Sequence, residues 1–229
     1  MKSVLLPERQ TSEDANDLQA RQIEEIVRLL RRLGPAGPRF QRRMEEVDSH
    51  LKTTDHNIFD QGLVELGELL GFTTWKPQGE APPDAVWQLG YDLLFIFEGK
   101  SNEAPGDGIS VQNCRQTSGH LNWGKAQDDF KDIKASYSIL VSPKSSIDEE
   151  AIPYSDSVYY LAISDTLRLF ETIESALIES RGIMTTTNTD ELGDRVLQIL
   201  TQKGLTSEGI RTLLTSKLIK DLEVHKNGE

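Results

Sequence analysis

Short apolar runs alternate with stretches of helical periodicity through the middle of the chain. In order, this pattern predicts a helix at 57–71, strands at 72–75, 83–87 and 93–100, helical pieces at 109–123 and 124–134, and strands at 137–141 and 157–163. The first helix has an apolar stripe of Ile58, Phe59, Leu63, Leu66, Leu69 and Leu70. This order of elements indicates an α/β fold with a mixed central sheet flanked by helices.

The strand at 93–100 is apolar on both faces. Phe95 and Phe97 alternate with Leu94 and Ile96, which is typical of a strand buried between helices. The segment 89–91 supplies a turn, so paired positions of the hairpin add to roughly 180–182. Asp84 then lies opposite residue 96, 97 or 98.

That register brings two carboxylates together at the end of the hairpin. Cβ atoms are about 5 Å apart in a directly opposite pair and roughly 7–8 Å apart in a diagonal pair. Either separation allows one divalent cation to bridge Asp84 and Glu98, with the Gly99 carbonyl as a third oxygen. An oxygen-rich site of this kind suits Mg²⁺ or Mn²⁺.

Helices are predicted on both sides of this core. The pattern favours helices at 11–33 and 38–51 before it, and at 165–180, 191–203 and 206–222 after it, with a threonine-rich linker at 184–189. We therefore divide the chain into an N-terminal helical extension (1–56), an α/β core (57–164) and a C-terminal helical segment (165–229).

The formal charge of the 229-residue chain is −12, and it is uneven. Residues 1–57 hold ten Lys/Arg and ten Asp/Glu, so the remaining residues bear the whole negative charge. An acidic body argues against tight, free-standing binding to nucleic acid. The arginines near 28–43 suggest a solvated face paired with Glu45 and Glu46. The alternative is a phosphate-contacting patch that includes Arg39, Arg42 and Arg43.

Other function classes are excluded by composition. A single cysteine, Cys114, excludes a disulfide framework and a cysteine-rich zinc site. No apolar run is long enough to span a membrane, and Pro7 interrupts the only candidate for a signal-peptide core. These features predict a bacterial-type cytoplasmic protein.

The segment 57–142 resembles the PD-(D/E)xK nuclease superfamily, which has the restriction-endonuclease-like fold. The signature stands as Pro83-Asp84 and Glu98-Gly99-Lys100. The helix that opens Phe59-Asp60 and ends Leu69-Leu70-Gly71-Phe72 looks like that of archaeal Holliday-junction resolvases and Mrr-like restriction enzymes. The run 116–123 most resembles a nuclease-like domain at the end of some bacterial helicase-like and phage-defence proteins.

The resemblance implies Mg²⁺- or Mn²⁺-dependent hydrolysis of DNA in defence, restriction or repair. It implies that Asp84, Glu98, the Gly99 carbonyl and Asp60 hold the metal, and that Lys100 positions the attacking water. Asp60 replaces the usual Glu, so Glu65 and Glu68 are fallback helix acids. Gln116 would orient the phosphate or Lys100. His120 lies one turn beyond Gln116, and a structural role is favoured over a phosphate contact.

Two other readings remain open from the sequence. The first is a nuclease-like interaction subunit, catalytically weak or inactive, that docks on a helicase, ATPase or other defence-system partner. The second is a nuclease that acts on RNA, since no residue pattern reads a base edge or a 2′-hydroxyl. Cleavage of both strands of a DNA duplex needs two active sites, so a homodimer or a larger complex is expected.

Overall fold

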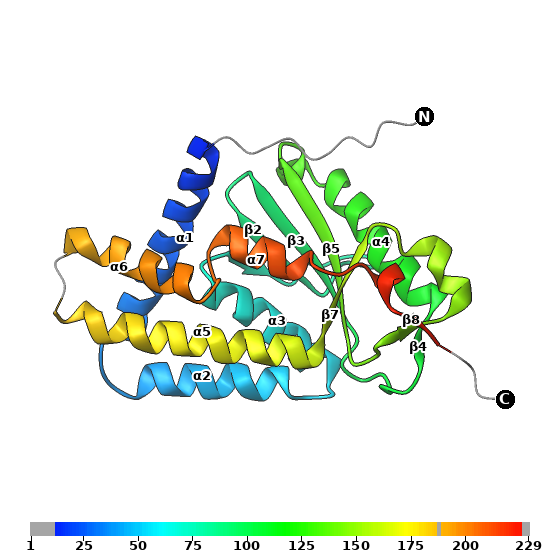
Figure 1. The fold of residues 1–229 in the computed structure, drawn as a ribbon, viewed down its shortest axis with the longest axis horizontal. Helices are drawn as coiled ribbons and strands as arrows, with labels where there is room; N and C mark the ends of the chain where they lie inside the picture. The colour runs from blue at the N-terminus through cyan, green and yellow to red at the C-terminus, as the bar shows by residue number, and fades with distance from the viewer. Residues whose placement is uncertain (1–11, 187–188, 226–229) are drawn as a thin grey trace.

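The centre of the molecule is a five-stranded mixed sheet. A computed structural model describes residues 12–186 and 189–225, and Figure 1 shows its fold. The strand order is β1-β2-β3-β5-β7, where the β1–β2 and β2–β3 pairs are antiparallel and the β3–β5 and β5–β7 pairs are parallel. The strands are β1 (Thr73–Trp75), β2 (Ala85–Leu89), β3 (Leu93–Gly99), β5 (Ala135–Ser142) and β7 (Val158–Ala162). The predicted α/β class with a mixed sheet is confirmed.

The β2–β3 hairpin has the predicted register. Ala85 pairs with Phe97 and Leu89 with Leu93, so paired positions add to 182. The backbone N–H of Asp84 donates to the Phe97 carbonyl at 3.0 Å, which extends the ladder by one residue. Asp84 therefore lies at the same end of the sheet as Glu98. Gly90 forms the turn with a φ of 58°, a conformation that glycine adopts without strain.

Helices cover both faces of β3, as its two apolar faces require. Phe95 and Phe97 pack in the main hydrophobic cluster with α3 (His56–Leu69), whereas Leu94 and Ile96 face the side covered by α4 (Val111–Ala126). Of the predicted α3 stripe, Ile58 is exposed and the rest is buried. Every residue of β3 is buried, so a charge at its end needs a partner.

The flanking helices pack against the same core. They are α1 (Ser12–Leu33), α2 (Pro38–Leu51), α5 (Ile163–Met184), α6 (Thr189–Gln202) and α7 (Ser207–Leu214), and Figure 1 shows α2 and α5 running side by side. Thr11, the expected first residue of the first helix, lies outside the described residues. The main hydrophobic cluster takes residues from all three predicted segments, for example Leu30, Leu66 and Phe170. Among the described helices, none has the length and apolar character needed to cross a lipid bilayer.

Two predicted helices are wrong in extent. The helical piece expected at 124–134 ends with α4 at Ala126, because Gln127 is extended, and only the short 3₁₀ helix η1 (Asp128–Phe130) follows. The helix expected at 206–222 ends at Leu214. Beyond it the chain runs along the edge of β7, where the Tyr160 N–H donates to the Lys217 carbonyl at 2.9 Å. Hydrogen bonding to a sheet edge replaces the helix there.

A second, small sheet was not predicted. It joins β4 (Gly108–Ile109), β6 (Ser146–Ile147) and β8 (Glu223–Val224), three strands of two residues each. The 3₁₀ helices η2 (Glu149–Tyr154) and η3 (Ile219–Asp221) contribute residues to the same hydrophobic cluster as β4 and β6. Strands this short contain no period-2 pattern, so sequence reasoning could not find them.

Gly67 is where α3 lies closest to the sheet. A Cβ at Gly67 would lie 2.6 Å from three atoms of the Trp87 indole, whose Nε1 donates to the Leu63 carbonyl at 2.8 Å. We expect Gly67→Ala to lower the free energy of unfolding by about 1–3 kcal/mol, because the helix and the indole must separate. Chemical denaturation measures this change.

The control for Gly67→Ala is Gly182→Ala in α5, where an added Cβ meets no atom of the described residues within 4 Å. That substitution should leave the free energy of unfolding unchanged or raise it by about 0.5–1 kcal/mol, since alanine has a higher helix propensity than glycine. Equal losses of stability in both variants would contradict the close approach of α3 to Trp87.

Candidate functional site

Three carboxylates come from three different elements at one end of the hairpin. Asp84 precedes β2, Glu98 is in β3 and Asp60 is in α3. The side chains of Asp60 and Glu98 are each only 1% exposed. Asp55 caps α3 by accepting from the N–H groups of Asn57 and Ile58, which fixes the start of the helix that carries Asp60. Buried carboxylates of this kind are costly unless they have cationic or hydrogen-bonding partners.

Gly99 is the point where the carboxylates of Asp60 and Asp84 meet. Its N–H donates to Asp84 Oδ2 at 2.8 Å. A Cβ at Gly99 would lie 3.0 Å from Asp60 Oδ1 and 3.2 Å from the Phe59 ring, so a larger residue would crowd Asp60. The absence of a side chain at Gly99 lets the helix acid approach the strand. The predicted role of the Gly99 carbonyl stays a prediction.

Helix α4 supplies the partners of Glu98 and Lys100. His120 Nε2 lies 2.6 Å from Glu98 Oε2, and Lys100 Nζ lies 2.5 Å from Glu98 Oε1. Lys100 Nζ also donates to Gln116 Oε1 at 3.3 Å. Gln116 therefore contacts the lysine, one of the two partners expected for it. His120 is buried against Glu98, which fits the structural role that the sequence favoured; a phosphate contact stays a prediction.

The carboxyl groups of the site differ strongly in acidity. Burial first, and then the negative charges of Glu98 and Asp60, raise the pKa of Asp84 to about 7. Burial also raises the pKa of Asp60, against the hydrogen bond and charge of Lys76. Burial acts upward on Glu98 too, but hydrogen bonds from His120 and Lys100 outweigh it and leave the pKa of Glu98 below its ordinary value. Three acids in one buried place thus repel one another.

Carboxylate oxygens are the donors that Mg²⁺ and Mn²⁺ prefer, and this site holds three carboxylates. Asp60 Oδ1 is buried and has no hydrogen-bond partner among the described residues, and the carboxyl groups of Asp60 and Asp84 interact. Two carboxylates can share such a contact only with a proton or a cation between them. Within the described residues, no three His, Cys, Asp or Glu side chains are grouped as they would be around a bound ion. Instead Asp60 and Glu98 each have a cationic side chain as partner.

Lys76 is a site residue that the sequence analysis missed. It follows β1, and its Nζ lies 2.8 Å from Asp60 Oδ2 and 3.2 Å from Asn57 Oδ1. It also lines a groove of about 750 Å³ together with Trp75, Trp123 and Phe130. The signal that could have identified Lys76 is the β1–β2 register. Trp75 pairs with Val86, so the next residue reaches the end of the sheet where Asp84 lies.

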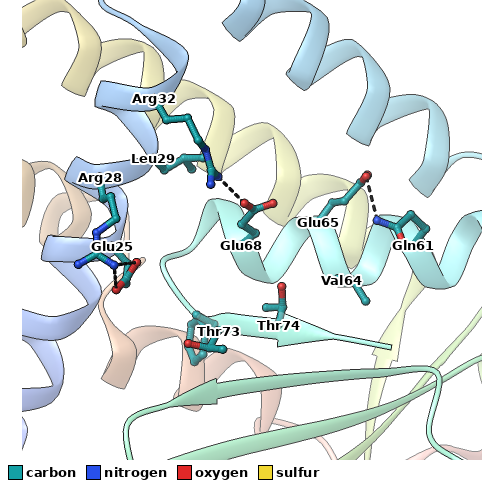
Figure 2. Close-up of a pocket in the computed structure, with 11 residues that line it drawn as sticks. Glu25, Arg28, Leu29, Arg32, Gln61, Val64, Glu65, Glu68, Thr73 and Thr74 are labelled. Atoms are coloured by element: carbon teal, nitrogen blue, oxygen red, sulfur yellow. Dashed lines mark hydrogen bonds and ion pairs between the residues drawn. The ribbon is translucent and has the colours of Figure 1, made fainter. Parts of the chain in front are cut away.

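The fallback acids Glu65 and Glu68 belong to a different network. Arg43 donates to Glu65 at 2.9 Å and to Glu68 at 2.8 Å, and His50 Nδ1 lies 2.8 Å from Glu65 Oε2. Glu65 also accepts from Gln61, as Figure 2 shows. Of the three helix acids, the structure brings Asp60, and not these two, to the end of the hairpin.

The arginines between positions 28 and 43 lie mainly on the surface, and several of them form ion pairs with glutamates. Figure 2 shows Arg28 bound to Glu25 and Arg32 bound to Glu68 around a pocket of about 330 Å³ between α1, α3 and β1. Arg43 is half-buried in its ion pairs, whereas Arg39 and Arg42 are exposed. The pairing seen for Arg43 includes the predicted Glu46, at 3.0 Å. A phosphate contact by Arg39, Arg42 or Arg43 stays a prediction.

The chain was compared with known proteins at three levels. No family model, no curated protein and no solved structure matches it significantly. Function is therefore inferred from the site itself and from the resemblance of its motif.

Proposed function

We propose that this protein is a Mg²⁺- or Mn²⁺-dependent nuclease with a restriction-endonuclease-like fold, which hydrolyses phosphodiester bonds in DNA. The observation that supports this most strongly is the meeting of buried Asp60 and Glu98 with half-buried Asp84 at the end of one hairpin, with Lys100 hydrogen-bonded beside them. The mixed central sheet flanked by helices supports the PD-(D/E)xK resemblance of the sequence.

The chemistry follows from what each side chain can do. Asp60, Asp84 and Glu98 would hold the divalent cation, which supplies positive charge to polarise a phosphodiester and acidify a water. The Lys100 ammonium is 20% exposed and can donate to a phosphate oxygen or orient a water. Gln116 keeps Lys100 in place, and His120 helps to keep Glu98 ionised and fixed in one orientation.

The charge of the chain bears on how DNA reaches the site. A formal charge of −12 disfavours tight binding to a polyphosphate by this chain alone. We therefore place the protein in a bacterial defence, restriction or repair complex, in which a helicase, an ATPase or a second copy of the chain presents the DNA. Such a complex would be cytoplasmic.

A cleavage assay tests the proposal. The wild type is incubated with linear, supercoiled and single-stranded DNA, and with RNA, in Mg²⁺, Mn²⁺ or EDTA. We expect metal-dependent cutting of DNA that is lost in Glu98→Ala and in Lys100→Ala. No cutting of any DNA would overturn the proposal for the isolated chain, and cutting of RNA alone would change the substrate.

The second candidate is a nuclease-like interaction subunit. The observation in its favour is that Asp60 and Glu98 already have cationic partners within the chain, as they would in a site that binds no metal. Intact Asp84, Glu98 and Lys100 weigh against it. A protein of this kind would bind no Mn²⁺ and would cut nothing.

A further inference from the structure

Lys76 is the cation that neutralises Asp60. Its Nζ donates to Asp60 Oδ2 at 2.8 Å, while Asp60 Oδ1 has no hydrogen-bond partner in the part of the chain that the structure describes. Asp60 is 1% exposed, and the ion pair with Lys76 is the largest contribution that favours its charged form. A divalent cation shared by Asp60 and Asp84 would also stabilise the negative charge of Asp60. The cation and the Lys76 ammonium would then repel each other.

Lys76 is more exposed than Lys100. Its side chain is 31% exposed against 20% for Lys100, and the chain beyond it passes through exposed residues 78–81. Each lysine donates to one carboxylate and one amide, Lys76 to Asp60 and Asn57 and Lys100 to Glu98 and Gln116. Lys76 also lines the groove of about 750 Å³ beside Trp75 and Trp123, into which its ammonium would move if it left Asp60.

We propose that Lys76 is an internal counter-ion, which takes the place of a divalent cation at Asp60 and must swing away before a cation binds there. This inference rests on the proposed metal dependence and adds a regulatory element to the same site. Lys76 then lowers the affinity for free metal and protects the buried acids when no metal is bound.

The experiment is a calorimetric titration with Mn²⁺ alone at pH 8. Removal of Lys76 in Lys76→Met should tighten Mn²⁺ binding by about tenfold or more, because the competing charge next to Asp60 is gone. Asp60→Asn should abolish that gain, so the double variant should bind like Asp60→Asn. Lys76→Arg keeps a competing cation and should bind like the wild type. Thermal denaturation checks that each variant is folded, and Lys76→Gln serves if the methionine variant is not.

The matched control is Lys203→Met, which also removes a lysine and its ion pair, here with Glu179 at 3.4 Å. Lys203 follows α6, which packs on α1 and α5. Removal of the Lys203 charge should change Mn²⁺ affinity by less than about twofold, because a distant charge acts only through screened electrostatics. If the wild type and Lys76→Met bound Mn²⁺ with the same affinity, this inference would be overturned but the proposed function would not. If neither the wild type nor Lys76→Met bound Mn²⁺, both the inference and the proposed function would be overturned.

Discussion

Replacing Lys100 by methionine is expected to reduce the rate of metal-dependent DNA cleavage by about 10²–10³-fold, the usual cost of removing one charged donor from a transition state. Lys100 Nζ lies 2.5 Å from Glu98 Oε1, so the same change also removes a partner of a buried carboxylate. Glu98 keeps its 2.6 Å contact with His120. The variant should therefore remain folded, and single-turnover cleavage measures the loss.

Mn²⁺ binding separates the catalytic role of Lys100 from a structural one. Because Lys100 is a cation next to the proposed ligands, Lys100→Met should bind Mn²⁺ at least as tightly as the wild type. Lys203→Met should keep full activity. If Lys100→Met retained wild-type cleavage, or lost cleavage and Mn²⁺ binding together, Lys100 would have no separate role in the reaction.

Replacing Asp84 by asparagine is expected to stabilise the protein at pH 8. An aspartate in the unfolded chain has a pKa of about 3.9, whereas the folded-state pKa of Asp84 is about 7. Between these two values the folded state keeps a proton that the unfolded state has released, so the stability of the wild type falls as the pH rises. Asparagine removes this penalty and can still accept the Gly99 N–H.

The gain from Asp84→Asn should be near zero at pH 4 and reach about 1–3 kcal/mol at pH 8. Urea denaturation across this pH range measures it. The control is Asp156→Asn, an exposed residue paired with Lys220, which should change stability by less than about 0.5 kcal/mol at every pH. A loss of stability at pH 8 in Asp84→Asn would show that the ionised carboxylate is stabilised by its surroundings, contrary to the repulsion from Glu98 and Asp60.

The sequence predicted the central hairpin because two constraints agreed. Alternation placed Phe95 and Phe97 on one face, and the glycine turn fixed the register to within two residues. Those constraints were enough to bring Asp84 to the end of the sheet that holds Glu98. The choice between Asp60 and Glu65 was not available from spacing. The two side chains project roughly 140° apart around the helix, and only the docking of α3 decides which of them faces the end of the hairpin.

The features that could not be predicted from the sequence depend on long-range contacts. Lys76 reaches Asp60 through the pairing of a three-residue edge strand, and His120 reaches Glu98 through the docking of α4 on β3. Neither contact has a local pattern. The end of the helix expected at 206–222 was missed for the same reason, because the edge of β7 offers hydrogen bonds that no propensity in that segment indicates.

The central claim is that Asp60, Asp84 and Glu98 form a cation site rather than a set of internal ion pairs. The most direct test is Mn²⁺ calorimetry at pH 8 on the wild type, Glu98→Gln and Glu65→Gln. We predict that the wild type binds Mn²⁺, that Glu98→Gln weakens binding by about tenfold or more, and that Glu65→Gln changes it by less than about twofold. Absence of binding to the wild type, or an equal loss in Glu65→Gln, would contradict the account.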